Sequence, residues 1–445
     1  MTRLTIQRFT CSTIVCGALA MAAVSTFAFD GATTSPEKEH EFLAVLRSDA
    51  QGAEKAMACK NLAIYGSSDA VPDLAKLLPD PQLSSWARIA LEAIPGDASD
   101  AALRKAVDTL EGQLLVGTIN SIGVRRDALA VEALTGKLQH ADHEVASAAA
   151  VALGQIANDA AVKSLRAVLT GSNATVRSAV AEGCVLCAER LASDGHAKVA
   201  TEIYDEVRKS DVPLQRIIEA TRGSILARGQ DGIPLLMETF QSDERKLIQL
   251  ALGTVREFPG NEIDKVLATE LSQTTPERAA LLIQAMADRP ETVVLSAILH
   301  AAEEGDKQVR LSAVEALRRV GDDSCLATLL KIASGDDSDL AEKARTTLAR
   351  LPGQRVDASI VAMLPKADES NHALLLQLVG ERRIDAVPEV MKALDSSAAS
   401  VRTAALVALG ETVSLDKLPV LISQMVAPKH AEDAAVAQQA PRRPA

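Results

Sequence analysis

A repeat of about thirty residues constrains this chain more than any other feature. Glycines that close apolar, helix-like runs recur 27 to 32 residues apart in two series. A Val-Arg dipeptide recurs in the same phase. A unit this short cannot bury its apolar side chains alone, so the repeat predicts a stack of small modules rather than several globular domains. The markers are Gly66, Gly96, Gly123, Gly154 and Gly183, then Gly321, Gly353, Gly380 and Gly410, with Val-Arg at 176–177, 309–310 and 401–402.

Each unit has the pattern of two helices joined by a short turn. Small and apolar residues cover most of residues 145–154, whereas residues 161–169 are apolar on one face only. We expect Gly154 to end the first helix in a left-handed conformation. Only 2% of the chain is aromatic, and a core of Ala, Leu, Val and Ile favours helices over sheets. The sequence therefore predicts an all-α fold, a right-handed α-solenoid of about eleven or twelve stacked two-helix repeats.

The repeats assign most of the chain to one architecture. The solenoid is expected over residues 46–426, with irregular or enlarged repeats at 193–260, where the period loosens. A lead-in with a capping helix is predicted at 29–45. Residues 427–445 are rich in Ala, Gln, Pro and charge, which predicts a disordered tail or linker.

An acidic residue precedes the second helix of several units by a fixed offset. It stands two residues before the first apolar position, and Pro follows that position, as tolerated in a first helical turn. A carboxylate there can accept hydrogen bonds from exposed backbone N–H groups. The predicted helix caps are Asp69, Asp231, Asp385 and Asp416.

The consensus Val-Arg-x-Ala-x-x-x-Ala-Leu-Gly, followed by Asp-Ala-Val-Pro-x-Leu, resembles HEAT-like repeats of the short, phycobilisome-lyase type. Residues 401–410 match it best. The resemblance implies the stacked-helix architecture. Repeats of this type occur in scaffolds, adaptors, chromophore-handling proteins and appendages of larger exported enzymes, so function must be argued from a site.

Two enzyme families share this repeat type. Deoxyhypusine hydroxylase is similar in its paired repeats, where several His-Glu dipeptides supply metal ligands. Here that dipeptide occurs only at His40-Glu41 and His143-Glu144, too few for a di-metal site. The chromobilin lyases are similar in repeat sequence alone. We therefore predict no enzymatic activity, no metal and no cofactor, with a lyase-type activity as a distant alternative.

Three groups of side chains could carry chemistry. Cys184 and Cys187 share one side of an apolar helix, which favours two core thiols, with a redox pair as the alternative. His140 and His143 are two potential ligands in a turn, short of a metal site and better explained as exposed polar residues.

The Val-Arg arginines recur at one position of the unit. We predict that Arg177, Arg310 and Arg402 form a structural ladder between successive repeats, because guanidinium groups can bridge carboxylates and turn carbonyls. Trp86 and Tyr204 are isolated aromatic residues in helical patterns and are expected in the core.

The first residues have the pattern of a secretory signal peptide. Arg3 and Arg8 precede an apolar stretch, and Thr26-Phe27-Ala28 provides small residues for cleavage after Ala28. Removal of residues 1–28 would change the net charge from −12 to −14, because they contain two Arg and no acidic residue. We expect an exported, periplasmic or extracellular protein without a membrane span in its mature chain. An uncleaved N-terminal anchor is the alternative.

The charge balance limits the partners. With 47 Lys and Arg against 59 Asp and Glu, the chain lacks the basic surface that nucleic acid requires. The leading hypothesis is an exported, non-enzymatic scaffold or adaptor that binds protein partners along an α-solenoid. The alternative is an accessory module of an exported redox or carbohydrate-processing enzyme system.

Overall fold

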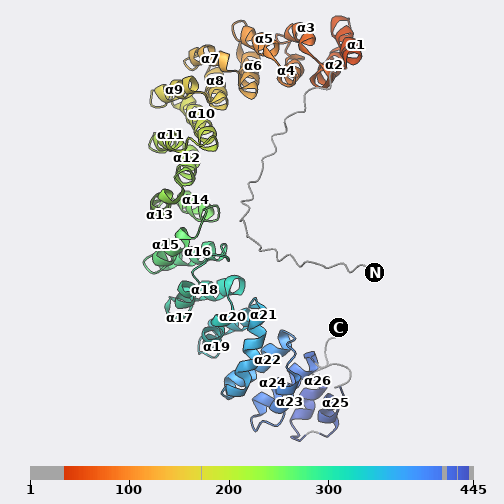
Figure 1. Ribbon diagram of the computed structural model, residues 1–445, viewed down its shortest axis with the longest axis vertical. Coiled ribbons are helices and arrows are strands. Elements are labelled where there is room, and N and C mark those ends of the chain that lie inside the picture. Colours follow the sequence, from red (N-terminus) through yellow and green to blue (C-terminus); the bar gives the residue numbers. More distant parts are fainter. Residues whose placement is uncertain (1–34, 172, 413–417, 428, 440–445) are drawn as a thin grey trace, which may run out of the picture. The chain divides into compact units, whose positions relative to one another are not determined.

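The computed structural model describes residues 35–171, 173–412, 418–427 and 429–439 (Figure 1). These residues form helices and connecting turns, with no strand among them. Twelve consecutive helix pairs run from α2/α3 to α24/α25, preceded by α1 and followed by α26. The predicted all-α fold of about twelve helix pairs is confirmed. The chain divides into two compact units, residues up to 194 with 209–216, and residues 195–208 with those from 217 onward.

In the first unit, successive first helices pack on one another and the second helices form a second row (Figure 1). Helix α1 (Pro36–Arg47) packs on α2, where a capping helix is expected from the sequence. The first row is α2 (Gly52–Tyr65), α4 (Ser84–Ala93), α6 (Gly112–Arg125), α8 (His143–Ile156) and α10 (Ala174–Ser193). The second row is α3 (Val71–Ala75), α5 (Asp97–Val107), α7 (Val131–Lys137) and α9 (Asp159–Val168), with 3-10 turns η1 (Ser68–Ala70) and η2 (Ala128–Ala130).

The second unit continues the alternation after an irregular start. Its helices are α11 (Ala197–Arg208), α12 (Leu214–Ala227), α13 (Ile233–Phe240), α14 (Arg245–Val255), α15 (Glu262–Leu271), α16 (Pro276–Ala287), α17 (Leu295–Glu304), α18 (Lys307–Val320), α19 (Leu326–Ala333), α20 (Ser338–Arg350), α21 (Gln354–Met363), α22 (Glu369–Glu381), α23 (Val387–Ala393), α24 (Ala399–Thr412), α25 (Leu418–Val426) and α26 (Asp433–Gln439). The 3-10 turns are η3 (Gly229–Gly232), η4 (Asp323–Cys325) and η5 (Leu364–Lys366). The boundary between the units falls within residues 193–260, where the sequence period loosens.

The C-terminal segment differs from the expected disordered tail. Helix α26 packs on α24 and α25, and Asp433 at its first position is buried. Arg402 of α24 is 1% exposed and donates from Nε to Asp433 Oδ2 at 2.9 Å. Residues 427–445 have the composition of a linker. The buried Arg402–Asp433 ion pair and the buried Ala437 nevertheless attach α26 to the preceding helices.

Gly154 and Gly183 act through close packing rather than through helix termination, whereas Gly66 and Gly321 are the C-cap residues of α2 and α18. Gly154 lies inside α8, and the left-handed residue that follows the helix is Ala157, with φ 54°. A Cβ added to Gly154 would lie 2.5 Å from the Gly183 Cα, and one added to Gly183 would lie 2.4 Å from the Ala150 carbonyl oxygen. These glycines therefore let α8 and α10 approach closely.

None of the predicted caps that the structure describes closes its helix, and the cap near Asp69 stands two residues earlier. Asp69 and Asp231 lie inside the 3-10 turns η1 and η3, and Asp385 caps no helix because α23 lacks a side-chain cap. Asp416 lies outside the described residues. Where a side-chain cap is present, it stands four residues before the first apolar position of the second helix, because a 3-10 turn precedes that helix. The side chain of the cap residue accepts a hydrogen bond from the backbone N–H of the residue two positions later. The caps there are Ser67, Asp127 and Asp322.

Candidate functional site: an apolar face, repeated clamps and a lysine-bordered furrow

Aromatic side chains divide sharply between the two units. Tyr204, Phe240 and Phe258 are at most 3% exposed in the second unit. The aromatic side chains described in the first unit all lie between α1 and α4, and none is buried. Trp86 is 37% exposed, so its expected place in the core is wrong, whereas that of Tyr204 is confirmed.

Four large apolar side chains are exposed on the adjacent helices α2 and α4. The N-terminal apolar face consists of Met57 and Ile64 on α2, with Trp86 and Ile89 on α4. Their exposed fractions run from 37% to 53%. Residues seven apart, and three apart, share one side of a helix, so each pair faces the same direction. Grouped exposed apolar side chains of this size are typical of interaction surfaces.

Tyr65 is fixed at the end of α2. Its ring stacks on Phe42 of α1 with centroids 6.2 Å apart, and Lys38 Nζ lies 4.2 Å above the ring centroid. The cation and the stacked ring restrict Tyr65 on the α1 side. Helix α2 therefore presents its apolar side chains from a rigid support.

An arginine clamp that the sequence analysis missed joins adjacent repeats at three places. Arg125 at the end of α6 donates to the carbonyl oxygens of Leu91, Glu92 and Ile94 at 2.8–3.1 Å, and pairs with Asp100 of α5. In the second unit, Arg289 and Arg382 make the same kinds of contact. Arg289 binds Val255, Phe258, Gly260 and Asp264, and Arg382 binds Leu348, Ala349, Leu351 and Asp357.

A missing backbone donor explains each clamp. Pro95 has no N–H, so it cannot bond the Leu91 carbonyl four residues earlier, and Arg125 supplies that donor. The same offset relates Pro259 to Val255 and Pro352 to Leu348. The Gly after each Pro has positive φ, between 77° and 109°, which turns the chain into the next helix. We call each apolar-Pro-Gly turn with its Asp and Arg a Pro-Gly clamp.

The clamps have a sequence signal that three aligned turns reveal. The pattern is an apolar residue, Pro and Gly, then Asp four residues after the Gly and Arg a further 25 residues on. It occurs at residues 94–125, 258–289 and 351–382.

The three predicted ladder arginines do not form one ladder. Arg177 Nη1 donates to the Asp211 carbonyl and carboxylate, at 3.0 and 2.6 Å. Arg310 Nε donates to the Ala302 carbonyl at 2.9 Å, at the end of the preceding helix. Arg402 reaches α26 instead. Each contacts a carbonyl or an acid as expected, but Arg177 and Arg402 bond residues 34 and 31 positions further on, whereas Arg310 bonds a residue 8 positions back.

Burial argues against redox use of the cysteine pair. Cys184 and Cys187 are at most 1% exposed on α10. Burial raises the pKa of the Cys187 thiol to about 12, which disfavours the thiolate that redox chemistry requires. The pair belongs to the core, as the main sequence interpretation states.

His140 and His143 make local polar contacts in the turn before α8. His140 Nδ1 accepts the Asp142 N–H at 3.1 Å, and His143 Nε2 lies 3.5 Å from Asn173 Nδ2. Within the described ranges, no three His, Cys, Asp or Glu side chains converge in a way that could hold a metal ion. Among the helices that the structure describes, none is both long and apolar enough to cross a bilayer.

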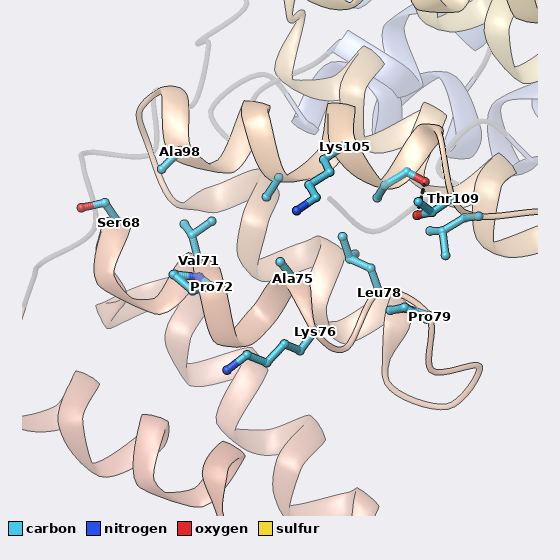
Figure 2. A pocket seen from close by; sticks show the side chains of 13 residues that line it. Ser68, Val71, Pro72, Ala75, Lys76, Leu78, Pro79, Ala98, Lys105 and Thr109 are labelled. Atoms are coloured by element: carbon cyan, nitrogen blue, oxygen red, sulfur yellow. Dashed lines mark hydrogen bonds between the residues drawn. The ribbon is translucent and has the colours of Figure 1, made fainter.

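The second row of the first unit contains a furrow between α3 and α5 (Figure 2). Its volume is about 580 Å³, within the range of ligand pockets. Val71, Pro72 and several alanines make it apolar, and Lys105 points from α5 into the space between the helices. Lys76 borders the α3 side and pairs with Asp73 at 2.8 Å. The Asp100–Arg125 clamp holds α5, the second wall.

Comparison with known proteins identifies the repeat type. Residues 113–184, from α6 to α10, match the family model described as HEAT repeats. These residues are HEAT repeats. The predicted HEAT-like character is confirmed, and the flanking helix pairs have the same two-row construction. No curated protein matches the chain.

Several solved structures are similar to this chain at low sequence identity. A structure of Kap95p binding to RanGDP is 12% identical, with a TM-score of 0.46, over 90% of this chain and 66% of that one. Kap121p bound to Nup53p is 11% identical, with a TM-score of 0.47, over 92% of this chain and 53% of that one. Importin beta is 14% identical, with a TM-score of 0.43, over 91% and 66%. This chain thus spans half to two thirds of their length, and TM-scores below 0.5 say nothing about what it binds.

Proposed function

We propose that this HEAT-repeat chain is an exported, non-enzymatic scaffold or adaptor that binds protein partners. The N-terminal apolar face is the observation that supports it. Trp is among the residues most enriched in binding hot spots, and the packed helices α2 and α4 together carry Trp86 and three further exposed apolar side chains. Preformed helical surfaces lose little conformational entropy on binding, which favours recognition of a protein segment.

Affinity capture with matched variants tests this function. The wild-type chain, the Trp86→Ser/Ile89→Ser variant and the Leu129→Ser control are used as bait in extract from the source cells. Leu129 is 76% exposed on η2 and lies outside the face, so it controls for loss of an exposed apolar side chain. Leu129→Ser should melt close to wild type and the face variant at a lower temperature, because Trp86 is only 37% exposed; circular dichroism checks that all three baits are helical at the temperature of the capture.

The expected result is a protein recovered with wild type and with Leu129→Ser, and weakened at least about 30-fold by the face variant, as for a hot spot of about 2 kcal/mol. Equal recovery by all three baits would contradict the proposed role of the face. Failure of every bait to recover any protein would contradict the scaffold function.

Export is tested on the N-terminus of the protein. N-terminal sequencing of the form outside the cytoplasm should begin at Phe29, as cleavage after Ala28 predicts. An intact N-terminus in the membrane fraction would support the anchored alternative, and one in the cytoplasm would refute export.

A further inference from the structure

The furrow between α3 and α5 has a counterpart of the same construction in the second unit. A furrow of about 780 Å³ lies between α19 and α21. The first walls correspond at an offset of 255 residues and the second walls at an offset of 257. On the first walls, Pro72, Ala75, Lys76 and Pro79 correspond to Ala327, Leu330, Lys331 and Ser334. On the second walls, Ala102, Lys105, Ala106, Thr109 and Leu110 correspond to Ser359, Ala362, Met363, Lys366 and Ala367.

Each furrow is bordered by two lysines, one from each wall. In the second unit these are Lys331, on α19, and Lys366, which follows α21. Both are exposed, and neither has an ion pair within the described residues. One carboxylate, that of Asp368, lines this furrow, and it accepts the Asn371 N–H and Nδ2, each at 2.9 Å. The furrow therefore offers two ammonium groups in a chain whose net charge is −12.

Lysine pairs at both furrows coincide with Pro-Gly clamps. The second walls, α5 and α21, each follow an apolar-Pro-Gly turn, and Arg125 or Arg382 ties each to the neighbouring first-row helix. The third clamp offers a contrast. It precedes α15, and the residue of α13 equivalent to Lys76 and Lys331 is Glu238. Two of the three clamps thus have a lysine at this position of the first wall, Lys76 or Lys331, and the third has Glu238.

We propose that the α3/α5 and α19/α21 furrows each bind an extended acidic segment of a protein partner. Packed helices are ~8–10 Å apart, and an extended chain rises ~3.3 Å per residue, so carboxylates three residues apart reach lysines on facing walls. Because side chains alternate along an extended chain, one of the two residues between the acids faces the alanine-lined floor. The segment has the form Glu-x-x-Glu with apolar residues at x. This inference rests on the proposed scaffold function and adds the chemistry of the partner.

Two lysines on facing helices favour a peptide over a single-headed amphiphile. A fatty acid has one carboxylate and would leave one of the two ammonium groups of the α19/α21 furrow, Lys331 or Lys366, without a partner. A peptide with two acids pairs with both of these lysines.

Fluorescence anisotropy of a labelled peptide tests the inference on the full chain. The probe is an acetylated, amidated peptide with two Glu-Ala-Leu-Glu segments, and its matched control replaces every Glu by Gln. The protein variants are Lys331→Gln/Lys366→Gln and Lys76→Gln/Lys105→Gln. The control is Lys265→Gln, an exposed lysine of α15 outside both furrows.

The expected results are saturable binding of the acidic probe and at least tenfold weaker binding of the Gln probe. Each surface charge pair contributes up to about fivefold, so each double variant should weaken its own furrow up to about 25-fold and leave the other intact. Lys265→Gln should bind as wild type, and affinity should fall as salt is raised.

Equal binding of the acidic and Gln probes, or equal affinity of all variants, would overturn the inference. Displacement of the probe by dodecanoate at lower concentration than by unlabelled peptide would assign the furrows to an amphiphile and overturn it as well. If the probe fails while Trp86-dependent capture persists, this inference alone fails and the proposed function stands.

Discussion

Adjacent repeats are joined in two different ways in this molecule. Between α6, α8 and α10, the helices touch through glycines, and a Cβ on Gly123, Gly154 or Gly183 would lie 2.1–2.5 Å from a neighbouring atom. Between α4 and α6, α14 and α16, and α20 and α22, an arginine crosses to the turn of the preceding repeat. The family model matches the glycine-joined stretch at 113–184, whereas the furrows with two lysines accompany clamped junctions.

The difference separates packing from turn chemistry. A glycine junction needs only small side chains on both helices. A clamped junction begins with a proline that removes a backbone donor, and the next repeat must supply the replacement. The stability of a glycine junction should fall when side-chain volume is added between the helices. The stability of a clamped junction should fall when its arginine is removed.

The largest expected effect is at the clamp with the most buried acid. Asp264 is 1% exposed and its side chain pairs with Arg289 at 2.8 Å. Arg289→Met leaves that carboxylate buried without its cation and should cost about 3–5 kcal/mol. Urea unfolding followed by circular dichroism measures the loss, and hydrogen exchange should localise it to α14–α16.

The double variant Arg289→Met/Asp264→Leu serves as its control. Removing both charges should recover most of the lost stability, because no buried carboxylate remains. A single variant within 1 kcal/mol of wild type would show that the clamp does not hold the junction.

The glycine junction should respond to a single methyl group. Gly183→Ala places a Cβ against the Ala150 carbonyl and should cost about 2 kcal/mol, because α8 and α10 must separate. Gly253→Ala is the matched control, since that helical position has no atom within 4 Å, and alanine should stabilise α14 by up to ~1 kcal/mol. Shifts of the same sign in thermal unfolding would refute the packing role of Gly183.

The irregular start of the second unit contains an ion-pair network around Asp205 and should respond to pH. Burial tends to raise the pKa of Asp205, but hydrogen bonds from Arg208, Ser224 and Arg228 outweigh it and lower the pKa to about 2. Because the folded pKa lies below the unfolded value, this stability is complete above about pH 4 and is lost as pH falls toward 2.

After allowance for solvent screening the contribution is about 1 kcal/mol. Denaturant unfolding of wild type and Asp205→Asn between pH 2 and 6 measures it. The two curves should converge at low pH, and a constant separation over the whole range would contradict the assignment.

The smallest effect distinguishes the two possible cap positions. Ser67 accepts the Asp69 N–H at 3.2 Å and its hydroxyl contacts Glu39 at 2.9 Å. Ser67→Ala should therefore cost about 1 kcal/mol, and Asp69→Ala less than 0.5 kcal/mol. Thermal unfolding of both variants tests the order, and the reverse order would restore Asp69 as the cap.

The sequence predicted the periodic elements well because burial imposes the period directly. Residues 145–154 and 401–410 lie in α8 and α24. The role of Gly154 was misassigned because a helix end and a close helix contact favour the same residue. The cap at Asp69 was placed two residues late because a 3-10 turn is not visible in the apolar pattern.

The candidate site was less predictable from sequence. Whether an apolar residue such as Trp86 is covered depends on its neighbours in space, and composition does not report that. The Pro-Gly clamp has a recognisable sequence pattern, but the pattern extends over 31 positions, from Ile94 to Arg125. Lysine pairs such as Lys331 and Lys366 belong to different helices and meet only in the folded stack.

The clamp also imposes an order on synthesis. When the ribosome has produced the turn at Ile94-Pro95-Gly96, the donor for its carbonyls is still untranslated, because Arg125 comes 29 residues after Gly96. The carbonyl oxygens at the end of each clamped helix therefore gain their arginine donor only after the next first-row helix has been synthesised. At each of the three Pro-Gly clamps, the folding of one repeat is completed by a residue of the repeat that is translated after it.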